Sequence, residues 1–152
     1  MTGHPDDRLD PLAEYREDIV KLMPYLPWLE QHSKEQMMRE YADPTQAQTF
    51  TFPVYDSNLL NFVKAASKTK LVYKNYPYVY SKFRIQNAQD ELRVIKQARP
   101  QDIDNLRGIL SNYIIKGRTK GTIWPTGVAN GVYAAILNKL RELYEYGGNV
   151  LT

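Results

Sequence analysis

The stretch from Asp102 to Tyr146 reads DIDNLRGILSNYIIKGRTKGTIWPTGVANGVYAAILNKLRELYEY and carries the clearest structural pattern of the chain. In its first part, apolar residues recur at helical spacing after two aspartates, which favour a helix N-terminus, and Lys116 and Gly117 mark the end. In its second part, Asn130 is suited to cap a helix whose apolar stripe continues to a glycine pair. The pattern predicts two amphipathic helices joined by a glycine-containing connector, with special backbone conformations at Gly117 and Gly131.

Apolar residues at helical spacing predict further helices upstream, over residues 12–23, 57–66 and 85–99. The first of these follows Asp10-Pro11, a start signal because proline in the first helical position gives up no backbone hydrogen bond. Pro24 and Pro27 are expected to break this helix and to leave a short second turn that reaches the core.

Three short segments are expected to be extended. They are Phe50–Val54, whose proline cannot donate to a strand ladder, Leu71–Tyr73, and Tyr76–Tyr80, which Pro77 helps to hold extended. The fold predicted from these patterns is mainly α, with at most a short extended or two-stranded element. We expect a mobile N-terminal tail over residues 1–9 and then one compact domain of about five to seven helices, residues 10–147.

The composition bounds the class of protein. The chain has 152 residues, the size of one ordinary domain, and contains no cysteine, which excludes disulfides, thiolate catalysis and cysteine-based metal sites. No apolar run approaches the roughly 20 residues that a membrane span requires, and the first residues are polar, unlike a secretory signal. These features predict a soluble cytoplasmic protein that does not associate with membranes.

One block of the chain has the order of a known family. Its landmarks are a basic helix end, Gly121, a short apolar stretch, the Asn-Gly pair at Gly131, and a closing helix of the type Ile-Leu-x-x-Leu-x-x-Leu at Ile136–Leu143. This block, together with the entry Phe52–Tyr55 into the next predicted helix, resembles a family of small bacterial proteins known only as a domain of unknown function. The resemblance covers about residues 50–145 and implies a compact, mainly helical fold, with no known activity or site.

The sequence shows no recognisable catalytic or metal-binding set. Its two histidines, His4 and His32, lack the H-E-x-x-H spacing of a zinc site, and no serine stands in a G-x-S-x-G context. The acid pairs Asp90-Glu91 and Asp102/Asp104 lie near predicted helix starts, where carboxylates ordinarily cap backbone donors. We therefore expect no catalytic residue, no metal and no cofactor.

Charge is unevenly distributed along the chain. Residues 1–43 hold ten acids and five basic residues, a balance of −5, and the remainder holds fifteen basic residues and seven acids, a balance of +8. Such asymmetry is typical either of an acidic segment lying across a basic surface of the same molecule or of a basic face that meets an external polyanion. The internal pairing is the simpler interpretation.

The segment from Lys68 to Arg84 contains five basic residues, five aromatic residues and no acid. Cations interleaved with rings suit a nucleic-acid strand, because the cations contact phosphates and the rings stack on nucleobases, and they also suit an acidic protein partner. The more economical interpretation is that the rings close the core while the lysines keep the segment soluble. The binding residues predicted by the first interpretation are Lys70, Tyr73, Lys74, Tyr76, Tyr80, Lys82 and Arg84.

The leading functional hypothesis is a non-enzymatic binding module with a basic, tyrosine-rich surface for nucleic acid or an acidic protein partner. One alternative is an enzyme with an anion-binding cleft near residues 117–131, where Arg118 and Lys120 would hold an anionic substrate. Another is a self-associating structural protein, a homo-oligomer in which Trp28 and Trp124 become buried against a second copy.

The region from residue 103 to residue 145 also has a loose helix-turn-helix appearance. Its connector is too long for the three- or four-residue turn of that motif unless Ile123–Val128 forms a middle helix. The structure of this connector therefore decides whether that DNA-binding motif is possible at all.

Overall fold

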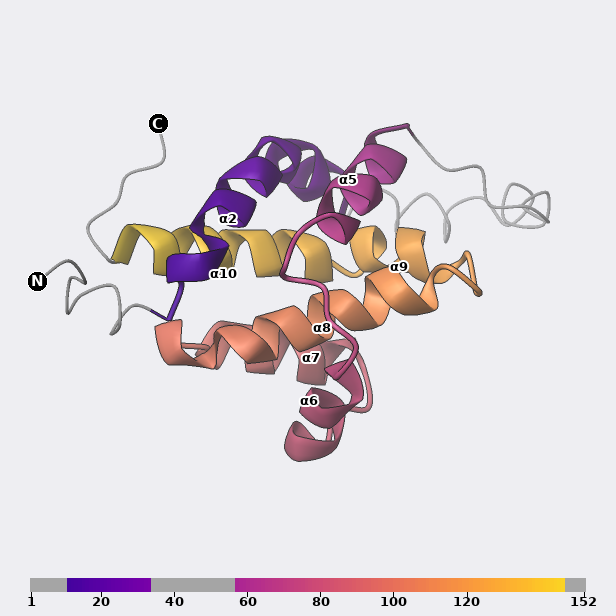
Figure 1. Cartoon of the computed structure of the whole chain (residues 1–152). Helices are drawn as coiled ribbons and strands as arrows, with labels where there is room; N and C mark the ends of the chain where they lie inside the picture. The colour runs from indigo at the N-terminus through magenta and orange to yellow at the C-terminus, as the bar shows by residue number, and fades with distance from the viewer. Residues whose placement is uncertain (1–10, 34–56, 147–152) are drawn as a thin grey trace, which may run out of the picture.

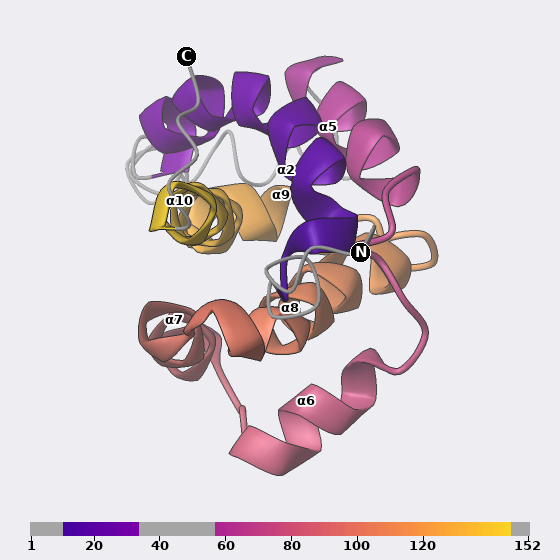
Figure 2. The ribbon, with the colours of Figure 1, turned by 60° about the vertical axis from the view of Figure 1, so that its left-hand side comes forward.

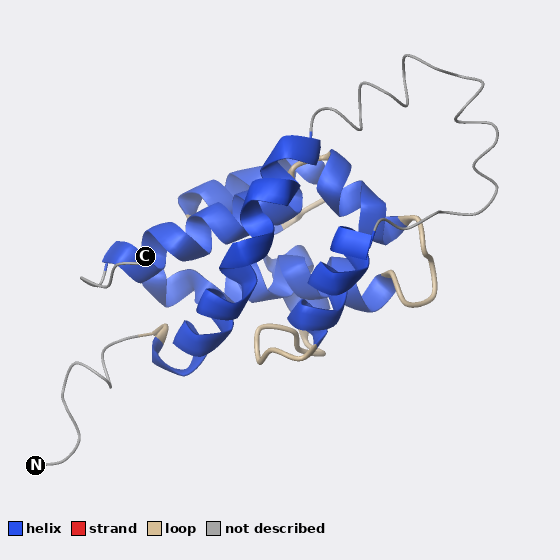
Figure 3. Ribbon diagram, turned by 90° about the horizontal axis from the view of Figure 1, so that it is seen from above, coloured by secondary structure: helices blue, strands red, loops and turns tan. Residues whose placement is uncertain are grey.

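The computed structural model describes residues 11–33 and 57–146, and the regular structure in these two ranges is helical throughout, with no strand (Figure 3). This confirms the prediction of a mainly α protein. The predicted tail over residues 1–9 and the predicted extended segment Phe50–Val54 lie outside the described residues, as does the Phe52–Tyr55 part of the family resemblance.

The N-terminal described segment turns without leaving helical conformation. It consists of the 3₁₀ turn η1 (Ala13–Tyr15), helix α2 (Arg16–Leu22), the 3₁₀ turn η2 (Met23–Tyr25) and a helix over residues 26–33. Pro24 lies in η2, as expected of a helix interruption. Pro27, however, lies in the first turn of the following helix, where its missing N–H costs no hydrogen bond, so the predicted break at this residue is wrong.

The second described segment contains six α-helices and one 3₁₀ turn. They are α5 (Ser57–Ser67), α6 (Tyr76–Phe83), α7 (Ala88–Gln97), η3 (Pro100–Asp102), α8 (Ile103–Lys116), α9 (Ile123–Ala129) and α10 (Val132–Tyr146). The two helices predicted from the C-terminal pattern are α8 and α10. Their bounds agree with the predicted end signals, because α8 ends at Lys116 and α10 begins directly after Asn130-Gly131.

The connector between α8 and α10 depends on two glycines for different reasons. Gly131 has a φ of +79°, a left-handed conformation as predicted, and the Asn130 Oδ1 beside it accepts the Val132 N–H at 3.0 Å. Gly117 has an ordinary φ of −64°, so the predicted special conformation is wrong there. Instead, a β-carbon at this position would lie 2.0 Å from the Trp124 ring, so only glycine allows the indole to pack this closely.

Helix α10 lies at the centre of the molecule. It packs against α2 on one side and against α7 and α8 on another, while α6 lies on the outer side of α8 (Figures 1 and 2). Two of the largest buried side chains, Phe62 of α5 and Tyr133 of α10, meet in this core with ring centroids 5.0 Å apart. Because the core draws on helices from both described segments, these residues form one domain.

Within the two described ranges, no helix has both the length and the apolar character needed to cross a membrane.

Candidate functional site

The second half of the basic, tyrosine-rich segment, Tyr76–Phe83, is the helix α6 and not extended chain. Tyr76 begins α6 and Pro77 occupies its first turn, where the fixed proline φ favours a helix and the missing N–H is not needed. The prediction that Pro77 holds Tyr76–Tyr80 extended, with three tyrosine rings on one side, is therefore wrong. A helix turns about 100° per residue, so it sends neighbouring tyrosines to different faces.

One face of α6 packs on α8. Val79 is only 2% exposed and lies against Gly108, where a β-carbon would come within 2.4 Å of the valine Cγ2. Tyr76 and Phe83 flank Val79 at helical spacing and are partly buried. The absence of a side chain at Gly108 thus lets α6 approach α8 closely, and this contact anchors the helix.

Tyr80 belongs to the same packed face and joins a buried polar network. Its hydroxyl donates to the Glu91 carboxylate of α7 at 2.5 Å, and the Tyr113 hydroxyl of α8 donates to the other oxygen of that carboxylate at 2.5 Å. Asn130 Nδ2 in turn donates to the Tyr113 hydroxyl at 2.9 Å. Burial, followed by the nearby Glu91 carboxylate, raises the pKa of both Tyr80 and Tyr113 above the ordinary value.

The Glu91 network resembles an acid–base set in its groups but not in its accessibility. Glu91 is 5% exposed and Tyr113 is 5% exposed, so a substrate has no route to the carboxylate. The adjacent Tyr133 hydroxyl is also buried and has no hydrogen-bond partner among the described residues. We interpret the network as the polar junction that joins α6, α7, α8 and the start of α10, because buried carboxylates are stable only when hydrogen-bonded.

The predicted capping roles of the paired acids are confirmed in part. Asn87 caps α7, because its Oδ1 accepts the Asp90 N–H at 2.9 Å, and Asp90 Oδ2 accepts the N–H of Gln86 just before the cap. Asp102 Oδ2 similarly accepts the Arg99 N–H at 3.0 Å. The other two acids do not cap: Glu91 lies in the core and binds two phenols, and Asp104 Oδ1 accepts from Arg107 at 2.7 Å.

Two further predicted binding residues, Lys70 and Tyr73, are held by Arg107 of α8. The guanidinium lies 4.2 Å from the Tyr73 ring centroid and 4.8 Å from that of Tyr15, and it donates to the Lys70 carbonyl at 2.9 Å. The Lys70 N–H donates to Asp18 of α2 at 3.0 Å, although the Lys70 side chain is exposed. The ring of Tyr73 is therefore occupied by a cation of its own chain.

The outward face of α6 is different in character. We call Tyr78 and Lys82 of α6, together with Lys74 just before the helix and Arg84 at its C-cap, the free face of α6, since all four side chains are exposed. Tyr78 is 59% exposed, and the Lys82 Nζ lies 6.0 Å from its ring centroid. Arg84 ends the helix with a left-handed φ of 53°. None of the three cations forms an ion pair within the part of the chain that the structure describes.

Tyr78 is thus an exposed residue that the sequence-based set of binding residues omits. The signal that identifies it is the i, i+4 spacing between Tyr78 and Lys82, which places both on one side of a helix. That signal is invisible as long as the segment is interpreted as extended. The same spacing assigns Tyr76 and Tyr80 to the opposite, packed face.

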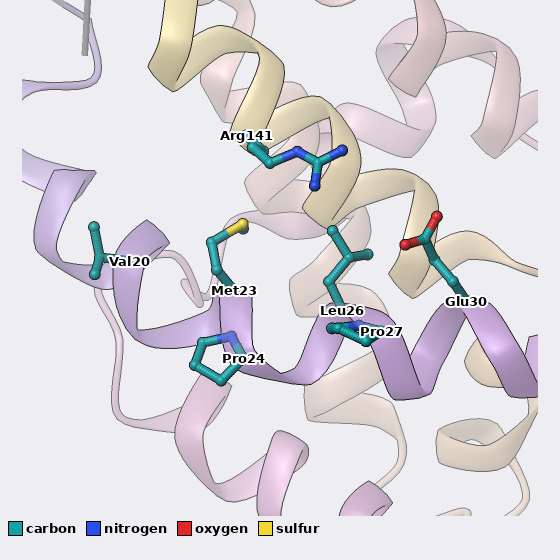
Figure 4. Close-up of a pocket in the computed structure, with 7 residues that line it drawn as sticks. All are labelled: Val20, Met23, Pro24, Leu26, Pro27, Glu30 and Arg141. Carbon is teal, nitrogen blue, oxygen red and sulfur yellow. The ribbon is translucent and has the colours of Figure 1, made fainter. Parts of the chain in front are cut away.

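The connector predicted to hold an anionic substrate is an exposed turn. Arg118 and Lys120 lie between α8 and α9 with exposed side chains, and Trp124 Nε1 beneath them donates to the Ile114 carbonyl at 3.1 Å. A groove of about 420 Å³ lies elsewhere, between the α2 segment and α10, as Figure 4 shows. Its lining residues are Val20, Met23, Pro24, Leu26, Pro27, Glu30 and Arg141.

The helix-turn-helix interpretation fails although the middle helix exists. Helix α9 (Ile123–Ala129) does form in the connector. However, the following helix, α10, has Val132, Tyr133 and Leu137 fully buried and lies at the centre of the fold. A recognition helix presents its N-terminal residues to a DNA groove, and the first residues of α10, Val132, Tyr133 and Ala134, are instead buried in the core.

The described residues also contain no group of three or more histidine and acidic side chains that could hold a metal ion. His32 Nδ1 donates to the Trp28 carbonyl at 2.9 Å, and its ring stacks on that indole with centroids 4.6 Å apart. This histidine therefore packs at the helix end and does not stand alone in solvent.

Neither the curated proteins nor the solved structures contain a match to the chain. A family does match, over residues 14–146, which span every helix described above. The chain therefore belongs to the Family of unknown function (DUF6508).

Proposed function

We propose that the chain is a non-enzymatic binding module that binds nucleic acid through the free face of α6. The observation that carries the proposal is the exposed Tyr78 ring with Lys82 beside it, in a segment of seventeen residues, 68–84, that contains no acid. Phosphates provide most of the affinity of proteins for nucleic acids, and exposed cations that form no ion pair within the described residues are suited to bind them. The other face of α6 is anchored on α8, so the cations are presented by a fixed element.

Three residues of the predicted binding set remain central to this proposal, namely Lys74, Lys82 and Arg84, and Tyr78 joins them. The side chain of Lys70 is exposed nearby in sequence and supplies a further cation. The three aromatic residues of the predicted set pack within the chain, so their rings do not contact the ligand in this proposal. These residues, Tyr73, Tyr76 and Tyr80, instead hold the free face of α6 in position. A bacterial origin and a cytoplasmic location are parts of the same proposal, supported by the C-terminal block and the cysteine-free composition.

The proposal is tested with fluorescence anisotropy on labelled single-stranded DNA, duplex DNA and RNA at low and moderate salt. The variant Lys74→Gln/Lys82→Gln/Arg84→Gln removes three exposed charges without touching the core. We expect it to weaken binding and to reduce the log–log salt slope by up to about 2, since each phosphate contact to a single strand contributes about 0.7. Circular dichroism checks that the variant stays folded.

A matched control removes the same number of charges elsewhere. Lys116, Arg118 and Lys120 are exposed at the α8–α9 turn, so the corresponding triple glutamine variant has the same net charge. Retained binding in this control supports the free face of α6 as the site. If the control loses binding while the α6 variant keeps it, the site is the anion-binding turn of the alternative hypothesis. If wild-type protein binds no nucleic acid even at low salt but binds polyglutamate, the partner is an acidic protein.

Self-association is the second candidate that a specific observation favours. Val20 is 44% exposed and lines the groove of Figure 4, where an apolar surface faces solvent beside the α2 segment. Trp28 and Trp124, the residues predicted to bury in a dimer, are instead engaged within their own chain, by His32 and by the Ile114 carbonyl. Sedimentation velocity over a hundredfold concentration range tests this candidate, and a concentration-independent monomer contradicts it.

A further inference from the structure

We infer, resting on the proposed function, that the ligand of the free face of α6 is a single strand and that Tyr78 stacks on one of its bases. The free face carries one aromatic ring, and 59% of Tyr78 is exposed. A single exposed apolar residue is common in proteins and by itself indicates nothing. Its position among cations, on a helix whose other face is packed, is what points to a ligand with both charge and flat apolar surfaces.

The position of Lys82 fits a nucleotide in particular. Its Nζ lies 6.0 Å from the Tyr78 ring centroid, so the ring and the cation are neighbours on one turn of the helix. A base stacked on the ring would bring its own phosphate within reach of this amine. Lys74 precedes α6 and Arg84 follows its last residue, and the eight residues of the helix span about 12 Å, so further phosphates of the same strand can be contacted on both sides.

The accessibility of base faces decides between a single strand and a duplex. In a duplex the faces of the bases are stacked on one another, and a protein reads only their edges in the grooves. A ring on a short, outward-facing helix can therefore stack only on an unpaired base. An acidic protein would satisfy the cations but offers no comparable use for the ring. The free face thus favours single-stranded DNA or RNA.

The test compares Tyr78→Ala with Tyr78→Phe on a single-stranded oligonucleotide, its duplex and an abasic oligonucleotide of equal charge. Stacking on an aromatic side chain is worth about a 5- to 150-fold change in affinity per base. We expect Tyr78→Ala to lose that much for the single strand and little for the duplex or the abasic strand. Tyr78→Phe, which keeps the ring, should bind as wild type does. Because Tyr78 is exposed, neither variant is expected to unfold.

A second readout locates the stacked base. The fluorescence of 2-aminopurine in the single strand should be quenched by wild-type protein and by Tyr78→Phe, and much less by Tyr78→Ala. The salt slope should be the same in all three proteins, because Tyr78 contacts no phosphate.

The outcomes separate this inference from the proposed function. If Tyr78→Ala binds the single strand as tightly as wild type while the triple glutamine variant does not, the stacking inference is wrong and the proposed function stands. Equal affinity of wild type for the abasic and the ordinary strand also overturns the stacking inference. Absence of any nucleic-acid binding overturns both.

Discussion

The two faces of α6 use the same types of residue for opposite purposes. Tyr80 lies on the packed face, where its hydroxyl binds the buried Glu91 carboxylate, whereas Tyr78, two residues earlier, is 59% exposed beside Lys82. Nothing in the identity of these tyrosines distinguishes them. Their roles differ because a helix turns two residues through about 200°, so one ring faces α8 and the other faces solvent.

The two faces of α6 show that packing against the core and exposure to solvent are not mutually exclusive in a segment rich in cations and aromatic rings. In this chain the packing interpretation of residues 68–84 is correct for one face of α6, and the binding interpretation stays a prediction for the other. The packed face makes the site rigid, and the free face offers the groups that a polyanion would contact. Changes on the packed face should therefore alter the free energy of unfolding, and changes on the free face should alter binding.

Removing the centre of the packed face should have the largest effect. Glu91→Ala leaves the Tyr80 and Tyr113 hydroxyls without their acceptor in a buried site, and it also opens a small cavity. We predict a loss of about 3–5 kcal/mol in the free energy of unfolding, measured by urea denaturation. A loss below about 1 kcal/mol would show that the network does not support the junction of the helices.

A matched pair of tyrosine variants sharpens the contrast between the faces. Tyr80→Phe deletes one hydrogen bond to a buried carboxylate and should lower the free energy of unfolding by about 1.5–3 kcal/mol. Tyr78→Phe deletes a hydroxyl that lies in solvent and should leave the free energy of unfolding unchanged. The midpoints of urea denaturation of the two variants measure this difference. Equal midpoints would contradict the assignment of the two rings to different faces.

The contact between α6 and α8 can be broken at one glycine. In Gly108→Ala the new β-carbon would lie 2.4 Å from Val79 Cγ2, so α6 has to shift outward, at a cost of about 1–3 kcal/mol. Adding Val79→Ala removes both Cγ atoms and leaves only the Val79 Cβ, at 2.8 Å, close to the new β-carbon. Because part of the clash is relieved, in a double-mutant cycle the two changes should be less destabilising together than their sum. Purely additive effects would mean that the two residues do not meet.

The smallest predicted effect is a dependence on alkaline pH. Burial raises the pKa of Tyr80 above its unfolded value of about 10, so the folded chain keeps a phenolic proton that the unfolded chain releases. The contribution of Tyr80 to the free energy of unfolding is therefore fully present below pH 10. It decreases by about 1.4 kcal/mol for each pH unit above this value. The stability gap between wild type and Tyr80→Phe should therefore narrow above pH 10. The free energies of unfolding of wild type and Tyr80→Phe are measured by urea titration between pH 9 and about 11.5. A constant difference between them over this range would contradict the prediction.

Much of the fold is predictable from the sequence because it depends on local signals. The apolar stripes and end signals of α8 and α10 agree with their observed bounds, and the positive φ of Gly131 follows from an Asn-Gly pair at a helix start. These features depend on helical periodicity and on backbone sterics, which act over a few residues. The interpretation of Pro77 fails for a local reason too, since proline is compatible both with extended chain and with a first helical turn.

Tertiary structure alone decided which groups of the site are available. That Arg107 occupies the Tyr73 ring, that Gly108 receives Val79, and that Glu91 meets two phenols are contacts between residues far apart in the chain. The sequence determined that this protein is mainly helical and that residues 68–84 are basic and free of acids. Only packing determined which of the tyrosines in the described ranges is exposed, because burial depends on the neighbours that distant helices bring together.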